Sequence, residues 1–135
     1  MAETSEYLFV YGSLLDKNNE FGSYLSNNCA FFEKGRFKGI LYDIGKYPGA
    51  IVDSGSSCYV HGSIFKIVHP VEVLEILDNY EGFGSEYAQP NEFIREVTDV
   101  EVGDNLLKCW AYLYNLPVKN LPVITNGDYF SYINI

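Results

Sequence analysis

The sequence predicts an α+β fold in which short strands form a small curled sheet or barrel and one main helix accompanies them. Three observations carry this expectation. Aromatic residues make up 16% of the 135-residue chain, and such residues favour strands. Short runs rich in Val, Ile, Tyr and Phe recur along the chain and are separated by Gly, Pro, Asn and Asp. One stretch, 70–81, has the apolar spacing of a helix.

The first half of the chain is expected to contain four strands and one short helix. The first strand is predicted at 7–11, where a continuous apolar and aromatic run ends at a glycine. A short helix is predicted over 20–27, where apolar side chains recur at intervals of three or four residues. The further strands are predicted at 30–44 (one long strand or a bent pair), 50–52 and 58–68.

Glycine and proline are expected to shape two of these strands. Gly35 and Gly39 interrupt the run 30–44, and an isolated glycine in a strand often marks a bulge or a bend. Pro48 and Gly49 predict a turn before the next strand, because proline fixes φ and glycine permits a positive φ.

The main helix is predicted over 70–81. Pro70 suits its first turn, where the missing N–H of proline is not needed, and Gly82 suits the position just past its end. A loop over 83–92 and an irregular aromatic C-terminal segment are expected after it. The last two strands are predicted at 93–102 and 106–115, joined by a tight turn.

Composition and charge limit the possible partners. The formal net charge is −9, so the chain has no electrostatic reason to bind nucleic acid or an anionic membrane. We expect one domain over residues 1–135, without a signal peptide or a membrane span. Cys29, Cys58 and Cys109 are widely spaced, which favours reduced, mostly buried thiols in a cytoplasmic protein.

Glu81 departs from the polarity expected at its position. It follows Val73 and Leu77 at intervals of four residues, so a carboxylate continues the apolar stripe of the main helix. If that face is buried, desolvation raises the pKa of Glu81 and suits it to acid–base catalysis near neutral pH. If the last helical turn frays, Glu81 is a solvated end residue. The helix pattern alone favours the solvated residue.

Other catalytic patterns have less support in the sequence. His61 and His69 lie eight residues apart with no third ligand nearby in the sequence, so we expect no metal site. The sequence also has no Gly-x-Ser-x-Gly motif and no phosphate-binding P-loop. Ser13 as a nucleophile would need a base that the sequence does not assign to it.

Two short motifs together resemble one known family. A Tyr-Gly-Ser-Leu stretch at 11–14 follows the first predicted strand, and Leu-Asp-Asn-Tyr-Glu-Gly at 77–82 ends the main helix. In this order they are similar to motifs of the gamma-glutamylcyclotransferase-like family, also described as AIG2-like or gamma-glutamylamine cyclotransferase-like. Further segments that resemble family motifs are 47–50, 60–62, 93–95 and 110–114.

The resemblance implies a small mixed β-barrel with flanking helices and an enzyme that needs no cofactor or metal. The implied substrate is a small γ-glutamyl amine or γ-glutamyl amino acid. Its own α-amine attacks its γ-carbonyl, which closes 5-oxoproline and expels the free amine. Glu81 matches the acid–base glutamate of the family. The residues assigned to substrate binding are Tyr11, Gly12, Ser13, Leu14, Tyr87 and Arg95.

The implied reaction suits the chemistry of these residues. An α-ammonium must lose a proton before it attacks, and a carboxylate at Glu81 is able to take that proton and pass it to the leaving nitrogen. The nucleophile is already tethered to the carbonyl within the substrate. Backbone N–H groups around Gly12, Ser13 and Leu14 are expected to stabilise the oxyanion without a net positive charge.

The chain departs from the family pattern at positions that bear on substrate identity. Ser63 stands where many members carry Glu, and Phe93 stands where many carry Tyr. Tyr87, in the long loop 83–92, is the candidate to supply the missing hydroxyl. A non-catalytic small-molecule binding module with the same pocket and a purely structural barrel are the alternative interpretations. The leaving group and the oligomeric state stay open.

Overall fold

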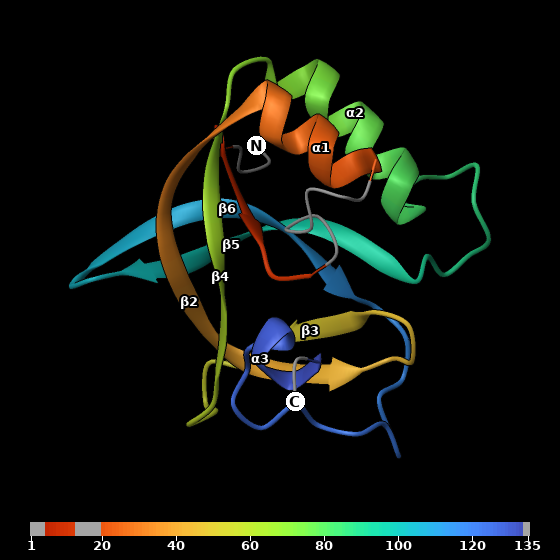
Figure 1. Cartoon of the computed structure of the whole chain (residues 1–135). Coiled ribbons are helices and arrows are strands. Elements are labelled where there is room, and N and C mark those ends of the chain that lie inside the picture. Colours follow the sequence, from red (N-terminus) through yellow and green to blue (C-terminus); the bar gives the residue numbers. More distant parts are fainter. Residues whose placement is uncertain (1–4, 13–19, 134–135) are drawn as a thin grey trace.

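A computed structural model describes residues 5–12 and 20–133, which form a mixed β-barrel with helices on its outside (Figure 1). The predicted α+β class is therefore confirmed. The strands are β1 (Tyr7–Val10), β2 (Cys29–Asp43), β3 (Pro48–Val52), β4 (Tyr59–Ile67), β5 (Phe93–Val102) and β6 (Asn105–Tyr114). The helices are α1 (Glu20–Asn28), α2 (Pro70–Glu81) and α3 (Tyr129–Ile133).

The pairing of the strands confirms the expected barrel. The strand order is β3-β2-β4-β1-β6-β5, and a further pairing of β2 with β5 closes the sheet on itself. β1 pairs in parallel with β6 at Leu8 and Trp110, whereas it pairs antiparallel with β4. The long, strongly curved β2 reaches from the end of α1 to β3, and β3 extends the barrel at its edge (Figure 1).

The bulge in β2 does not lie at a glycine, although the sequence suggests one there. The register of β2 against β4 shifts between Phe31 and Glu33. Gly39 instead lies where another strand comes close, because a Cβ atom there would be 2.1 Å from the carbonyl oxygen of Ile51. The glycine therefore permits close contact between β2 and β3.

The predicted turn at Pro48 and Gly49 is also wrong, because these are the first two residues of β3. The turn lies earlier, at Gly45, where φ is 130° and the backbone N–H donates to Asp43 Oδ1 at 2.8 Å. Proline is tolerated as the first residue of a strand, where its missing donor breaks no ladder bond. The sequence does not predict the five-residue α3, because this helix is too short to give a periodic pattern.

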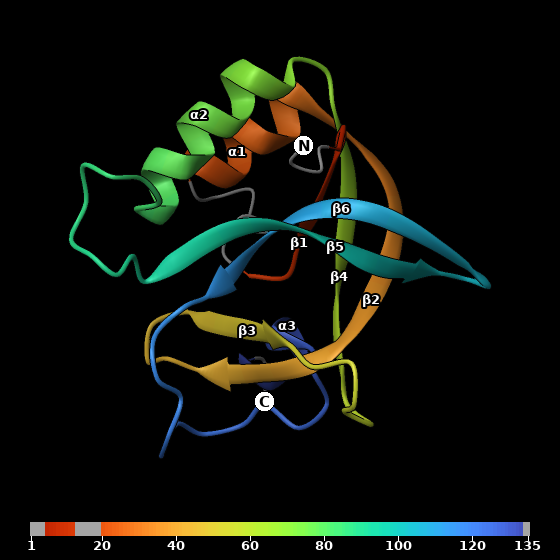
Figure 2. The same cartoon turned by 180° about the vertical axis from the view of Figure 1, so that it is seen from behind.

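The alternation of side chains along β1 separates two hydrophobic clusters. Phe9 and Tyr11 belong to the cluster inside the barrel, whereas Leu8 and Val10 belong to a second cluster with residues of α1 and α2. Figure 2 shows α1 and α2 side by side over one end of the barrel and α3 near the other end. α2 contributes Val73, Leu74 and Leu77 to the second cluster, which fixes its apolar face toward the barrel.

The end of α2 does not fray. Gly82 adopts the left-handed conformation with φ of 70°. The backbone N–H groups of Gly82 and Phe83 donate to the carbonyl oxygens of Asn79 and Asp78 at 3.3 and 2.9 Å. These bonds satisfy carbonyls at the helix end. Glu81 is therefore held in the last helical turn, on the face that the apolar stripe predicts.

All three thiols are free. Cys29 and Cys109 are buried, as expected, whereas Cys58 is exposed. Burial raises the pKa of the Cys29 thiol to about 11 and that of Cys109 to about 12, so both stay protonated at neutral pH. In the described part of the chain, no helix combines the length and the apolar character that crossing a membrane requires.

Two glycines with positive φ provide a matched test of the fold. A Cβ at Gly127 (φ 68°) would lie 1.7 Å from the carbonyl oxygen of Tyr59, whereas at Gly103 (φ 58°) no described atom lies within 4 Å. We expect Gly103→Ala to cost about 1 kcal/mol of unfolding free energy for the backbone conformation alone. Gly127→Ala is expected to cost at least about 2 kcal/mol more. Equal losses in urea unfolding would contradict the close approach of Gly127 to β4.

Candidate active site

A cavity of about 440 Å³ lies where the end of α2 meets β1, β6 and the segment that leads into β3. This volume is within the range of small-molecule sites. Its walls bring Tyr11 and Gly12 together with Glu81, although these residues are far apart in the sequence. The lining residues are Phe9, Val10, Tyr11, Gly12, Lys46, Tyr47, Pro48, Tyr80, Glu81, Glu92, Phe93 and Tyr112.

Glu81 is a half-buried carboxyl in this cavity, one turn after the fully buried Leu77. Its pKa is raised from 4.5 to about 7. The main cause is burial, which disfavours the charged form, and the negative charges of Glu92 and Asp78 add to it. Both the protonated and the ionised form of Glu81 are therefore available near neutral pH, as a group that both accepts and donates a proton requires.

Glu92 and Tyr47 form a hydrogen-bonded pair in the same cavity. The hydroxyl of Tyr47 donates to Glu92 Oε2 at 2.5 Å. Burial and the contact with Glu92 raise the pKa of Tyr47 to about 12, so this hydroxyl keeps its proton. Sequence reasoning gave neither residue a role. Tyr47 begins the segment 47–50, which resembles a family motif, and Glu92 directly precedes another such segment, 93–95. Their places beside these motifs are the only signals in the sequence that point to them.

The hydroxyl of Tyr11 is used by the backbone of the barrel. It donates to the carbonyl oxygen of Tyr112 at 2.5 Å and accepts from the N–H of Ala50 at 3.1 Å. Burial raises the pKa of Tyr11 well above its usual range. Next to it, a Cβ on Gly12 would lie 3.0 Å from Pro48 Cγ, so a side chain there would press on the cavity wall. Ser13 and Leu14 lie outside the described residues.

Tyr87 and Arg95 do not line the cavity, so the structure does not bring them to Glu81 as expected. The hydroxyl of Tyr87 donates to Asn79 Oδ1 at 2.9 Å. Arg95 is held by the carboxylate of Asp78 on α2. Tyr47 lines the cavity next to Phe93, and the centres of the two rings lie 5.8 Å apart.

None of the described side chains is grouped as a metal site would require, because no three or more His, Cys, Asp or Glu residues converge. Ser63, where many family members carry Glu, lies in β4 opposite Val10 and does not line the cavity. The acidic groups of the cavity are Glu81 and Glu92, and Lys46 is its basic group. The arrangement therefore offers proton transfer and hydrogen bonding to a small polar molecule.

Comparison with known proteins identifies the family. Residues 8–131 match the family described as gamma-glutamyl cyclotransferase, AIG2-like. The chain belongs to this family. It is 31% identical over 122 residues to the gamma-glutamylcyclotransferase family protein YtfP of Escherichia coli (strain K12), which covers 90% of this chain and 94% of that protein. The resemblance inferred from the two sequence motifs is therefore confirmed.

Solved structures share the cyclotransferase-like fold. The solution structure of ytfP from Escherichia coli has a TM-score of 0.65 at 26% identity and covers 94% of this chain and 98% of that one. The crystal structure of an aig2-like protein from Mus musculus has a TM-score of 0.66 at 22% identity and covers 87% of this chain and 84% of that one. The latter likeness concerns the fold alone.

Burial of Glu81 predicts a pH-dependent stability. Its pKa is about 7 in the folded protein and about 4.5 when exposed, so the folded state binds this proton more tightly. The stabilising contribution is fully present below pH 4.5 and is lost as the pH rises through 7. Relative to the wild type, Glu81→Gln is therefore expected to gain about 1–3 kcal/mol in unfolding free energy between pH 4 and pH 8.

The matched control is Glu75→Gln, which makes the same change at an exposed position of α2. Urea unfolding at the two pH values measures both variants against the wild type. We expect no comparable gain for Glu75→Gln. A Glu81→Gln difference that is the same at both pH values would contradict the raised pKa of Glu81.

Proposed function

We propose that this protein is a cofactor-independent cyclotransferase that converts a γ-glutamyl amine or γ-glutamyl amino acid to 5-oxoproline and the free amine. The observation that carries the proposal is the carboxyl of Glu81, whose pKa is near 7 in a cavity shared with Tyr11 and Gly12. Membership of the gamma-glutamyl cyclotransferase, AIG2-like family supports it. The free thiols accord with a cytoplasmic location, where thiols stay reduced.

In the proposed reaction, Glu81 moves protons from the attacking nitrogen to the leaving nitrogen. Its carboxylate takes a proton from the α-ammonium of the substrate, and the resulting amine attacks the γ-carbonyl carbon. A new C–N bond closes the five-membered ring. The bond between the γ-carbon and the leaving nitrogen then breaks as protonated Glu81 returns the proton to that nitrogen. The ring nitrogen gives up its second proton to the regenerated Glu81 carboxylate, which passes it to the released amine, so the products are the neutral lactam and an ammonium. No oxidant, reductant or second substrate takes part.

The cavity wall supplies the remaining requirements of this reaction. Because the nucleophile and the carbonyl belong to one molecule, the protein has to fold the substrate and does not have to bring two molecules together. Gly12 presents backbone at the wall without a side chain, and we assign the γ-glutamyl group to this region. Tyr47, Glu92 and Lys46 are candidate partners for the polar parts of the substrate.

The direct test is an assay of 5-oxoproline with a panel of γ-glutamyl amines and γ-glutamyl amino acids. We expect turnover by the wild type and a fall of about 10²–10⁴-fold in kcat for Glu81→Gln, which is the usual contribution of a general acid–base group. Glu75→Gln, at an exposed position of the same helix, is expected to retain activity.

Each outcome of this assay decides between the interpretations of the cavity. Turnover that survives Glu81→Gln would remove Glu81 from the mechanism. Binding of panel members without any 5-oxoproline would favour the non-catalytic binding module. Neither binding nor turnover with any member would count against a γ-glutamyl site of either kind.

The pH dependence offers a second prediction. The base form of Glu81 is its carboxylate, so kcat/KM is expected to rise as the pH increases through about 7. Glu92 raises the pKa of Glu81 by its negative charge. Glu92→Gln should therefore move this acidic limb to lower pH by about half a pH unit or more. The control Glu96→Gln changes an exposed carboxylate outside the cavity, and an equal movement there would contradict the assignment.

A further inference from the structure

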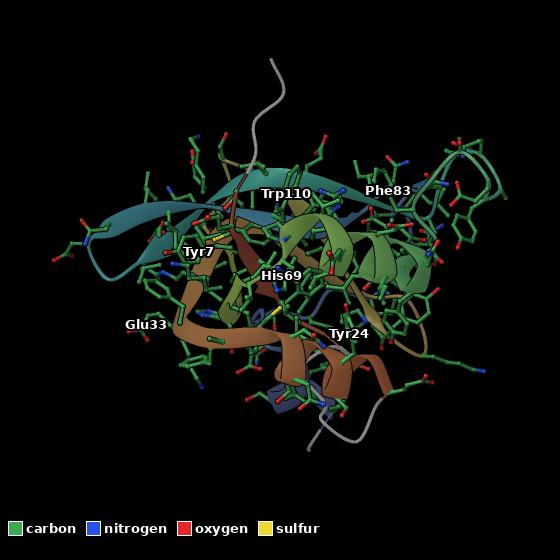
Figure 3. All side chains as sticks on the ribbon, turned by 90° about the horizontal axis from the view of Figure 1, so that it is seen from above. Tyr7, Tyr24, Glu33, His69, Phe83 and Trp110 are labelled. Carbon is green, nitrogen blue, oxygen red and sulfur yellow. The ribbon has the colours of Figure 1, made fainter. Side chains whose placement is uncertain are left out.

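Arg95 is the centre of a half-buried network behind the cavity. Its Nε and Nη2 atoms donate to Asp78 Oδ1 and Oδ2 at 2.7 and 3.0 Å. The two side chains are only 17% and 19% exposed. The guanidinium carbon also lies 4.3 Å from the ring centre of Trp110 and 5.9 Å from that of Phe83. Figure 3 shows Phe83 and Trp110 on the side of α2 that faces β5 and β6, away from Tyr24 of α1.

Asp78 connects this network to the cavity. Its Oδ1 atom also accepts a hydrogen bond of 2.7 Å from the hydroxyl of Tyr112. Tyr112 is 4% exposed, lines the cavity and is the cross-strand partner of Arg95. Asp78 also lies three residues before Glu81, on the same side of a helical turn. One carboxylate thus contacts the outer arginine and a wall residue of the cavity.

We propose that Arg95 is a positioning residue for the cyclotransferase reaction. It fixes Asp78, which in turn holds the side chain of the wall residue Tyr112 by its hydroxyl and determines the charge next to Glu81. This inference rests on the proposed function. Arg95 was expected to bind the substrate directly. In this proposal it acts on the reaction through Asp78 instead. The bidentate pair is suited to this task, because two parallel bonds fix the carboxylate plane as well as its position.

The network has an electrostatic consequence of definite sign. With Arg95 present, the guanidinium offsets the negative charge of Asp78. Without Arg95 that charge is uncompensated and disfavours the Glu81 carboxylate, whereas loss of the Asp78 charge favours it. The charged and titratable groups that surround Glu81 among the described residues are Asp78 and Tyr80 on its own helix, with Glu92, Lys46, Tyr47, Tyr11 and Tyr112 from the other segments.

The test is a direct titration of the Glu81 carboxyl carbon by NMR in the full chain. We expect the midpoint to rise in Arg95→Met and to fall in Asp78→Asn, each by about half a pH unit or more. Arg95→Lys keeps the charge without the bidentate geometry and should return the midpoint toward that of the wild type. The acidic limb of kcat/KM should move in the same directions.

Arg36→Met is the matched control. Arg36 also pairs with a carboxylate, that of Glu101 at 3.3 Å, and its guanidinium lies 3.8 Å from the ring centre of Tyr59, but it does not line the cavity. Its removal should leave the Glu81 midpoint unchanged. Both variants lose an ion pair with a carboxylate and a contact with an aromatic ring, but only Arg95→Met loses a contact with Asp78. The Arg36 pair has a single hydrogen bond and its arginine is 45% exposed.

Opposite movements for Arg95→Met and Asp78→Asn support the proposal. Midpoints that stay within error of the wild type, or that move equally in Arg36→Met, overturn it. If Arg95→Met does not fold, Arg95→Gln takes its place. It also removes the charge, so the proposal requires its midpoint to rise while that of Asp78→Asn falls. A wild-type protein that makes no 5-oxoproline would refute the proposed function, whereas the NMR midpoints still decide whether Arg95 acts on Glu81.

Discussion

The hydroxyl of Tyr11 joins the strands on which the cavity depends. It donates to the Tyr112 carbonyl on β6 and accepts from the Ala50 N–H on β3, while Tyr11 itself directly follows β1. Because the hydroxyl is buried, loss of either bond would leave a polar group unpaired, which is costly. The hydroxyl therefore links the segment after β1 to β3 and β6. Gly12 and Pro48 both line the cavity and lie so close that a Cβ on Gly12 would be 3.0 Å from Pro48 Cγ, and they take their positions from this junction.

Local elements of the fold were predictable because their signals are local. Pro70 and Gly82 define the ends of α2, and apolar runs locate the strands. The closure of the barrel was predictable only as a class, since no local pattern states that β1 pairs in parallel with β6. Gly39 shows a second limit: the sequence marks a special backbone position, but only the neighbouring strand determines whether it is a bulge or a close contact.

The candidate site also has residues that the sequence predicts and residues that only the structure reveals. The apolar stripe of α2 draws attention to Glu81, but that pattern alone favours a solvated end residue. Its acid–base role is implied only by the resemblance of two motifs to the family. Glu92 and Tyr47 were missed because their importance lies in a contact between segments 45 residues apart. The motif around Arg95 located the residue, but not the direction of its side chain, which Asp78 determines from another element. Motifs in the sequence can thus point to residues at functional positions. The neighbours that set the pKa and the orientation of these residues come from other segments and are known only from the tertiary structure.

The bond between Tyr11 and Tyr112 spans 101 residues, and this distance bears on the order of assembly. A chain is synthesised from its N-terminus, so Tyr11 emerges long before its carbonyl acceptor exists. Closing so long a loop costs entropy that is recovered only when β6 packs beside β1. Nascent chains that stop before β6 therefore lack one wall of the cavity, although they already carry Glu81. The cavity is therefore completed late, because β6 is one of the two strands that the barrel places side by side.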